Sequence, residues 1–147
     1  MSMNRKKLAT VLIALNLVFI WGNSLMTGTD SGNLSGGIMA WLNAFLGLGP
    51  EGAQLLHLLI RKAAHFTEFA CLGALLAWRC LQGKETHYMA FPALLGMAAG
   101  LVDETIQLFT PDRGPSLTDV WIDTSGAVAG MMLLVLGHHL WKRKFNN

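Results

Sequence analysis

The feature that most constrains the fold is an uncharged stretch near the N-terminus. Residues Leu8 to Thr29 form 22 consecutive positions without Asp, Glu, Lys or Arg. An apolar helix of about 20 residues is long enough to cross the hydrocarbon core of a bilayer. The stretch follows Arg5-Lys6-Lys7, and no small-residue cleavage site precedes the polar residues 27–33. It is therefore predicted to be a signal anchor and not a cleaved signal peptide.

Three further apolar runs, residues 69–78, 88–102 and 124–141, reach the length of a membrane span only when their polar flanks are included. Charged residues make up 14% of the chain, against about 25% in soluble proteins, so much of the surface is expected to face lipid. The sequence predicts a single all-α domain over residues 1–147, an integral membrane bundle of about four transmembrane helices. The expected spans are Leu8–Thr29, Ile60–Trp78, Tyr88–Phe109 and Leu117–Trp141.

Two other features refine this prediction. The run Leu34–Gly49 is apolar but short and rich in Gly and Ser, which favours an extra short interfacial or re-entrant helix. Pro50-Glu51 is typical of a helix start, because Pro fits the first turn and a carboxylate is favourable there. Pro92, inside the third expected span, is predicted to kink it.

The charged residues are distributed asymmetrically about these spans. If the N-terminus is cytoplasmic, eight of the eleven Lys and Arg residues lie on the cytoplasmic side, and eight of the nine acidic residues lie outside or in the outer half. Because short cytoplasmic flanks are enriched in Lys and Arg, this pattern predicts a multi-pass cell-membrane protein with both termini in the cytoplasm. The net charge of +2 is too small for nucleic-acid binding, so no nucleic-acid partner is expected.

Polar residues gather in stripes on the outer parts of the expected helices. With about 100° of rotation per residue, each of three helices places its polar positions on one face. The stripes are His57, Arg61, His65 and Glu68; Asp103, Glu104 and Gln107; and Asp119 and Asp123, continued by Gly126 and Gly130. The last two form a Gly-x-x-x-Gly, which is expected to let a neighbouring helix backbone come close. The Pro- and Gly-containing turn 110–118 is expected to hold Arg113 over the helix ends. Together these residues predict one outward-facing polar pocket.

Simpler readings compete with a functional one. Arg61, Lys62 and Arg113 could neutralise the carboxylates as ion pairs that hold the bundle together, and Asp119 also fits a first-turn acid after a Ser116 N-cap. A metal site would combine His65 with two or three carboxylates. No diagnostic ligand spacing supports one, so the sequence predicts no metal and no cofactor.

The sequence segments that carry the three stripes resemble the corresponding segments of the VanZ-like membrane proteins. The resemblance is carried by Arg61–Phe69, Asp103–Arg113 and Asp119–Gly126 in this order, and it extends over about residues 24–130. Asn23-Ser24, with Ser31 and Ser35, is similar to the serine-bearing stretch that follows the first helix in that family. The chain departs from the family pattern at Asp123, where Asn is common, at Phe69, where Tyr is common, and at Leu25-Met26.

The resemblance implies a multi-pass envelope protein whose namesake confers low-level resistance to teicoplanin, a lipoglycopeptide that binds the D-Ala-D-Ala end of peptidoglycan precursors. The partners it implies are the lipid bilayer and a lipid headgroup, a lipid-linked peptidoglycan precursor or the lipoglycopeptide itself. The oligomeric state and the identity of the ligand stay open.

Whether the protein is an enzyme also stays open. In a non-enzymatic reading, Arg61 and Arg113 contact an anionic headgroup and Glu68, Asp103 and Glu104 orient them. In an enzymatic reading, His65 or Glu68 is the general base for a lipid-linked substrate and Asp103 or Glu104 is its partner. A proton- or ion-coupled transporter and a purely structural bundle are the remaining alternatives. The candidate binding residues are Arg61, His65, Glu68, Asp103, Glu104, Gln107, Arg113, Asp119 and Asp123.

Overall fold

The computed structural model describes residues 4–82 and 90–145, without the side chains of residues 31–35. The described chain consists of helices and contains no strand, so the predicted all-α class is confirmed. The helices are α1 (Arg5–Ser24), α2 (Gly28–Leu46), α3 (Pro50–Leu81), α4 (Ala90–Leu108) and α5 (Leu117–Phe145).

Local sequence explains where these helices begin. The side chain of Asn4 accepts a hydrogen bond from the Lys6 amide and caps α1, and Thr27 caps α2 in the same way through the Asp30 amide. Pro50 occupies the first turn of α3, as predicted. Ser116 accepts a hydrogen bond from the Thr118 amide ahead of α5, which confirms the predicted N-cap.

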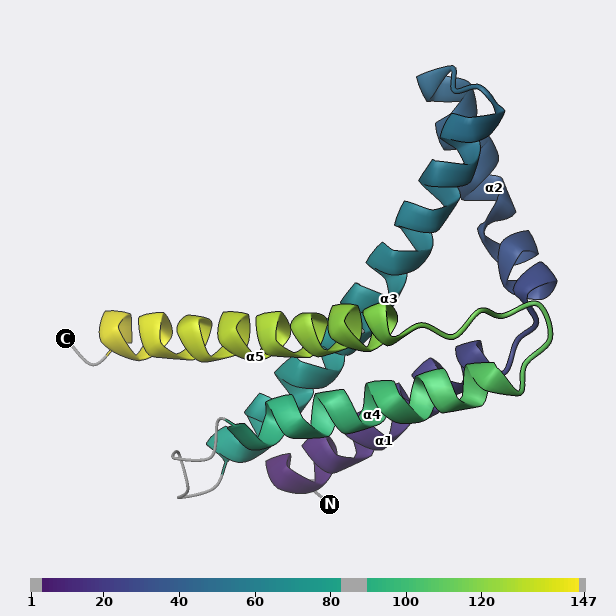
Figure 1. Ribbon diagram of the computed structural model, residues 1–147. Coiled ribbons are helices and arrows are strands. Elements are labelled where there is room, and N and C mark those ends of the chain that lie inside the picture. Colours follow the sequence, from purple (N-terminus) through teal and green to yellow (C-terminus); the bar gives the residue numbers. More distant parts are fainter. Residues whose placement is uncertain (1–3, 83–89, 146–147) are drawn as a thin grey trace.

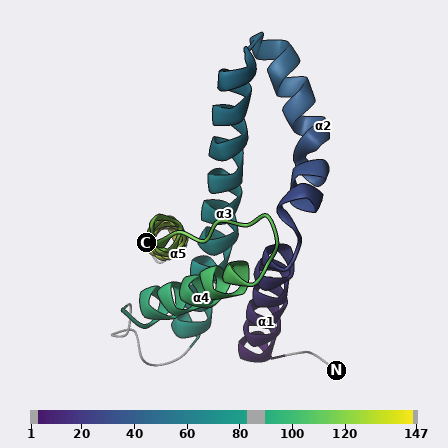
Figure 2. The ribbon, with the colours of Figure 1, turned by 45° about the vertical axis from the view of Figure 1, so that its right-hand side comes forward.

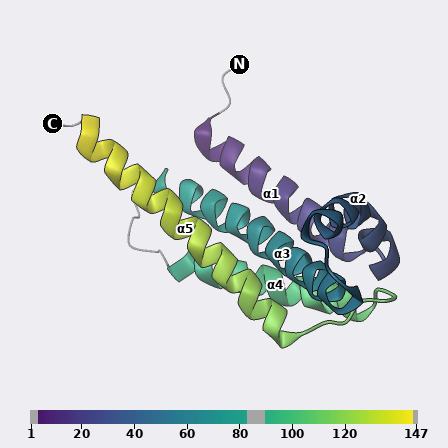
Figure 3. The same ribbon diagram turned by 90° about the horizontal axis from the view of Figure 1, so that it is seen from above.

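The helices form a body and a projecting hairpin. The body consists of α1, α4, α5 and the C-terminal half of α3, which pack together (Figure 3), and α3 crosses α5 obliquely (Figure 1). The N-terminal half of α3 and the whole of α2 extend away from this body (Figures 1 and 2). Because α3 is continuous over 32 residues, it is roughly 48 Å long at a rise of 1.5 Å per residue, and it belongs to both parts.

Several expected boundaries differ from the observed ones. The first expected span ran to Thr29, but α1 ends at Ser24 because Thr27 already caps the next helix. The short helix expected within 34–49 is a helix of 19 residues that begins at Gly28. Ile60 lies inside α3 and not at its start, and Tyr88 lies outside the described residues. Pro92 is the third described residue of α4, and because residues 83–89 lie outside the described residues, the expected kink there stays a prediction.

Small residues let α5 approach α3 closely. A Cβ atom on Gly126 would lie 2.4 Å from the carbonyl oxygen of Phe66, and one on Gly130 would lie 1.8 Å from that of Ala70. From the opposite side, a Cβ on Gly73 would lie 1.9 Å from the carbonyl oxygen of Ala127. The predicted close approach at the Gly-x-x-x-Gly stripe is therefore confirmed, and it brings the polar positions of α3 and α5 together.

The body buries several polar side chains and exposes many large apolar ones, which is the reverse of the usual pattern in a water-soluble protein. An apolar core between α1, α3 and α4 contains Ile20, Phe69 and Leu72, and the polar side chains buried with it are Ser24, Asp103, Glu104, Gln107, Thr110 and Asp123. Large apolar side chains instead remain exposed on every helix. By length and apolar composition alone, α1 and α5 are the two described helices that meet the requirements of a membrane span. The predicted bundle of about four transmembrane helices is therefore not confirmed and stays a prediction.

Candidate functional site

The buried polar side chains meet where α3, α4 and α5 pack together. His65 on α3 points between Asp103 on α4 and Asp123 on α5. Its Nδ1 atom lies 3.8 Å from Oδ2 of Asp103 and 3.6 Å from Oδ1 of Asp123. Both carboxylates are completely buried, and the His65 side chain is 15% exposed. One predicted residue from each stripe therefore contributes to a single cluster.

Asp103 is held by neighbours on two helices. The Ser24 hydroxyl on α1 donates a hydrogen bond of 2.5 Å to Oδ1, and Nε2 of Gln107 donates one of 2.8 Å to Oδ2. The Oε1 atom of Gln107 in turn accepts a hydrogen bond of 3.0 Å from Arg61. The amide of Gln107 thus links a guanidinium group on α3 to a carboxylate on α4, which fixes the orientation of both.

The two predicted glutamates lie on either side of this cluster. Glu104 accepts a hydrogen bond of 2.6 Å from the backbone amide of Ser116, so it ties α4 to the start of α5. Glu68 accepts one of 3.0 Å from Nδ2 of Asn23 on α1. Each carboxylate therefore has a donor from another segment, which offsets part of the cost of removing it from water.

Arg113 is placed by the backbone and not by a carboxylate. Its guanidinium group donates hydrogen bonds to the carbonyl oxygens of Met26 and Asn23, at 3.0 and 2.9 Å. Burial lowers the pKa of Arg113 from its usual value, and the positive charge of Arg61 lowers it further. The turn that carries Arg113 packs against α2, where a Cβ on Gly28 would lie 2.2 Å from the carbonyl oxygen of Asp112. The predicted position of Arg113 over the helix ends agrees with these contacts.

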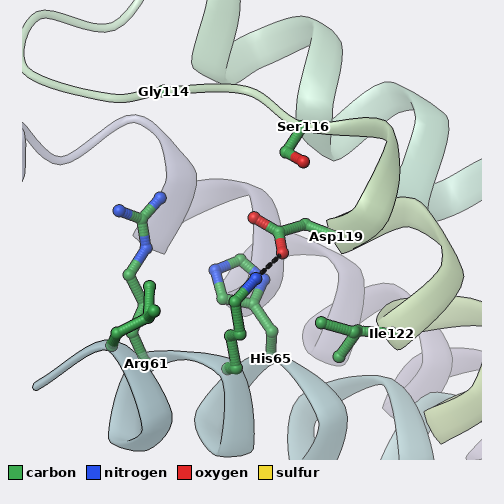
Figure 4. A pocket seen from close by; sticks show the side chains of 8 residues that line it. Arg61, His65, Gly114, Ser116, Asp119 and Ile122 are labelled. Atoms are coloured by element: carbon green, nitrogen blue, oxygen red, sulfur yellow. Dashed lines mark hydrogen bonds and ion pairs between the residues drawn. The ribbon is translucent and has the colours of Figure 1, made fainter. Parts of the chain in front are cut away.

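Asp119 has a structural partner. It forms a hydrogen-bonded ion pair with Lys62, and both side chains remain partly exposed. Figure 4 shows this contact beside His65, with Ser116 and Gly114 on the far wall. Among the described residues, this is the one direct ion pair between a Lys or Arg and a carboxylate. The expected neutralising ion pairs are therefore confirmed for Lys62 with Asp119. Arg61 and Arg113 bond instead to an amide oxygen and to backbone carbonyls.

Two cavities meet at Arg61 and His65. The larger cavity, of about 490 Å³, lies between α1, α2, α3 and the Arg113 turn, and the smaller cavity, of about 220 Å³, lies between α3 and α5. All four residues of the predicted α3 stripe line the larger cavity, where His57 is exposed. The sequence predicted one pocket, whereas the side chains of Arg61 and His65 border two.

Three residues that form hydrogen bonds in the site were not among the predicted binding residues. Asn23, Ser24 and Thr110 each donate a side-chain hydrogen bond that links α1 to α3 or α4. The resemblance had indicated Asn23-Ser24 only as part of a serine-bearing stretch, and the side chains of Ser31 and Ser35 lie outside the described residues. The polar pair Asn23-Ser24 in an otherwise apolar helix could have indicated these contacts, because polar residues in a bilayer need hydrogen-bond partners.

The sequence profile of the VanZ/LLP1 family matches residues 8–138. No curated protein and no solved structure matches the chain. The family match covers most of the chain and includes all three polar stripes together with the residues that hold them. The chain therefore belongs to the VanZ/LLP1 family.

Proposed function

We propose that this chain is a VanZ-like cell-envelope protein that binds the anionic headgroup of a lipid-linked envelope component in the larger cavity. The observation that carries the proposal is that Arg61 and Arg113 line the same cavity. Neither forms an ion pair with a carboxylate in the described part of the chain. Guanidinium groups bind phosphate oxygens through pairs of hydrogen bonds, which makes a phosphate-bearing headgroup the best-matched ligand.

The rest of the cavity wall supports a lipid ligand. Phe19 on α1, Ile38 on α2, and Ile60 and Ala64 on α3 provide apolar surface beside the two arginines. A cavity with cationic groups at one place and apolar walls around them complements a molecule with an anionic head and a hydrocarbon chain. A free anion in water would use only the cationic part of this surface.

The proposed membrane arrangement places the cavity at the outer leaflet. In it, α1, α3, α4 and α5 cross the membrane, with the basic residues Lys142, Arg143 and Lys144 of α5 in the cytoplasm. The Arg113 turn and the hairpin of α2 and α3 are then outside. The exposed side chains of Trp41 and Phe45 on α2 suit an interfacial position, where aromatic rings are favourable. Membership of the VanZ/LLP1 family and the apolar exterior support this arrangement.

The experiment is a ligand-dependent unfolding measurement on the purified chain in detergent micelles. Tryptophan fluorescence is followed on heating in the presence of farnesyl phosphate or, as the uncharged counterpart, farnesol. We expect farnesyl phosphate to raise the Tm and farnesol to leave it unchanged. Arg61→Gln should abolish the difference, whereas the control Arg143→Gln, on an exposed part of α5 away from the cavity, should retain it. Equal responses to the two probes in the wild-type chain would contradict headgroup binding.

A second candidate is a membrane enzyme that acts on a lipid-linked substrate. It is favoured by the position of His65, whose ring borders both cavities while buried carboxylates flank it. Glu68 lines the larger cavity and is the alternative general base. Turnover of a fluorescent polyprenyl-diphosphate-linked sugar, lost in Glu68→Gln while the unfolding temperature is retained, would support catalysis. Binding without any product would favour the non-enzymatic reading.

A further inference from the structure

Three potential ligand atoms from three helices converge inside the body. They are Nδ1 of His65, a carboxylate oxygen of Asp103 and a carboxylate oxygen of Asp123, and all lie within 4.8 Å of one another. The separations of 3.6 and 3.8 Å from Nδ1 to the two carboxylates exceed the usual hydrogen-bond length of about 3.0 Å. The three groups therefore face one another without bonding directly.

Two of these groups have no other partner. In the described part of the chain, the two carboxylate oxygens of Asp123 and the Nδ1 atom of His65 are buried. None of these three atoms makes a hydrogen bond with a described residue. Asp123 has no exposed surface at all. A buried carboxylate without a partner is strongly unfavourable, so this arrangement points to a group that bonds to Asp123 and His65 together.

We propose that His65, Asp103 and Asp123 bind one divalent transition-metal ion of the Zn²⁺ or Mn²⁺ class. With metal–ligand bonds of about 2.1 Å, two ligands of one ion lie about 3.0 to 3.8 Å apart, which matches the two separations measured from Nδ1 of His65, 3.6 and 3.8 Å. One imidazole and two carboxylates form a donor set that suits these ions. A neutral imidazole, two carboxylates and a dication also sum to zero charge, which lowers the cost of burial in a bilayer.

The surroundings of the three ligands support the proposal. Ser24 and Gln107 hold the Asp103 carboxylate in place through hydrogen bonds to its two oxygens, as the neighbours of metal ligands commonly do. His65 borders both cavities, so an ion would have a route to the cluster and could keep a coordination position for a further ligand. The proposal concerns the buried cluster and does not depend on headgroup binding at Arg61 and Arg113.

The test uses the full chain, purified in detergent, treated with EDTA and dialysed against micromolar ZnCl₂ or MnCl₂. We expect one bound ion per chain by inductively coupled plasma mass spectrometry, with a higher Tm than the EDTA-treated chain. Asp123→Asn keeps the shape of the side chain but removes its charge, and should weaken binding by at least about tenfold. The matched control is Asp119→Asn, one turn earlier on α5 and paired with Lys62, which should bind the ion as the wild type does.

The proposal is overturned if the wild-type chain binds only substoichiometric amounts of both ions, or if Asp123→Asn binds as tightly as the wild type. Should Asp123→Asn fail to fold, a Co²⁺ titration of the wild-type chain decides the question. Visible absorption bands that saturate at one equivalent and disappear on Zn²⁺ addition support the site, and their absence overturns it. Arg113→Gln changes a cavity side chain whose hydrogen bonds go to the backbone carbonyls of Met26 and Asn23. It is expected to lose the farnesyl phosphate response while still binding the ion, so the two proposals can fail separately.

Discussion

The hydroxyl of Ser24 on α1 donates a hydrogen bond of 2.5 Å to Oδ1 of Asp103 on α4, and both side chains are buried. The backbone carbonyl of Ser24 also accepts a hydrogen bond from the Thr110 hydroxyl, at 3.0 Å. Ser24, the last residue of α1, is thus bonded both to Asp103 on α4 and to Thr110, which follows α4 in the chain. The position of α1 and the orientation of the Asp103 carboxylate are therefore coupled.

Ser24→Ala should destabilise the protein because it leaves Oδ1 of Asp103 without its donor in a buried place. The expected loss is about 1–3 kcal/mol in the free energy of unfolding, measured by denaturant titration in mixed micelles. The matched control is Ser125→Ala, since the Ser125 hydroxyl is exposed and bonds only to the carbonyl of Ile122 in its own helix. Equal stability of the two variants would contradict the assigned role of Ser24.

Gly130→Ala should separate α5 from α3, because the added Cβ would lie 1.8 Å from the carbonyl oxygen of Ala70. Such an overpacked contact costs about 1–3 kcal/mol. Gly137→Ala is the control on the same helix, since a Cβ there would meet nothing within 4 Å, and Ala is favoured over Gly in a helix by about 1 kcal/mol. Thermal unfolding should therefore shift in opposite directions for the two variants, and a Gly130→Ala chain as stable as the wild type would contradict the close packing.

The proposed topology predicts opposite labelling of the two ends of α5. Gly114→Cys and Lys144→Cys are each introduced into a chain that carries Cys71→Ala and Cys80→Ala, which removes both native thiols. A membrane-impermeant maleimide added to intact cells should label Gly114→Cys, because the Arg113 turn is proposed to be outside. Lys144→Cys should react only after permeabilisation. Labelling of both positions, or of Lys144→Cys alone, in intact cells would exclude the arrangement.

Membership of the VanZ/LLP1 family makes glycopeptide resistance a phenotype to test for this chain in a sensitive Gram-positive host. Expression of the wild-type chain is expected to raise the inhibitory concentration of teicoplanin and to leave that of vancomycin unchanged. Arg61→Gln should lose the shift at a matched membrane level, because a guanidinium group in the larger cavity is removed, whereas Arg143→Gln should keep it. No shift with the wild type would limit the family relationship to fold and site, and would give lipid-substrate assays priority.

Local sequence was enough to predict the elements and the faces on which they carry polar residues. The start of α3 at Pro50, the Ser116 cap and the close approach at Gly126 and Gly130 were all predicted and are confirmed. Helices satisfy their own backbone hydrogen bonds, so caps, apolar periods and polar stripes can be recognised within a few turns.

The length of α3 and the partners of the polar groups depend on the tertiary structure. Hydropathy alone predicted a span from Ile60, whereas α3 is continuous from Pro50 to Leu81 and its first half extends away from the body. The pairing of Lys62 with Asp119, and the meeting of His65 with Asp103 and Asp123, join residues on different helices. Such contacts depend on how far each helix is rotated and shifted against its neighbours, which close packing at the glycines decides and hydropathy does not.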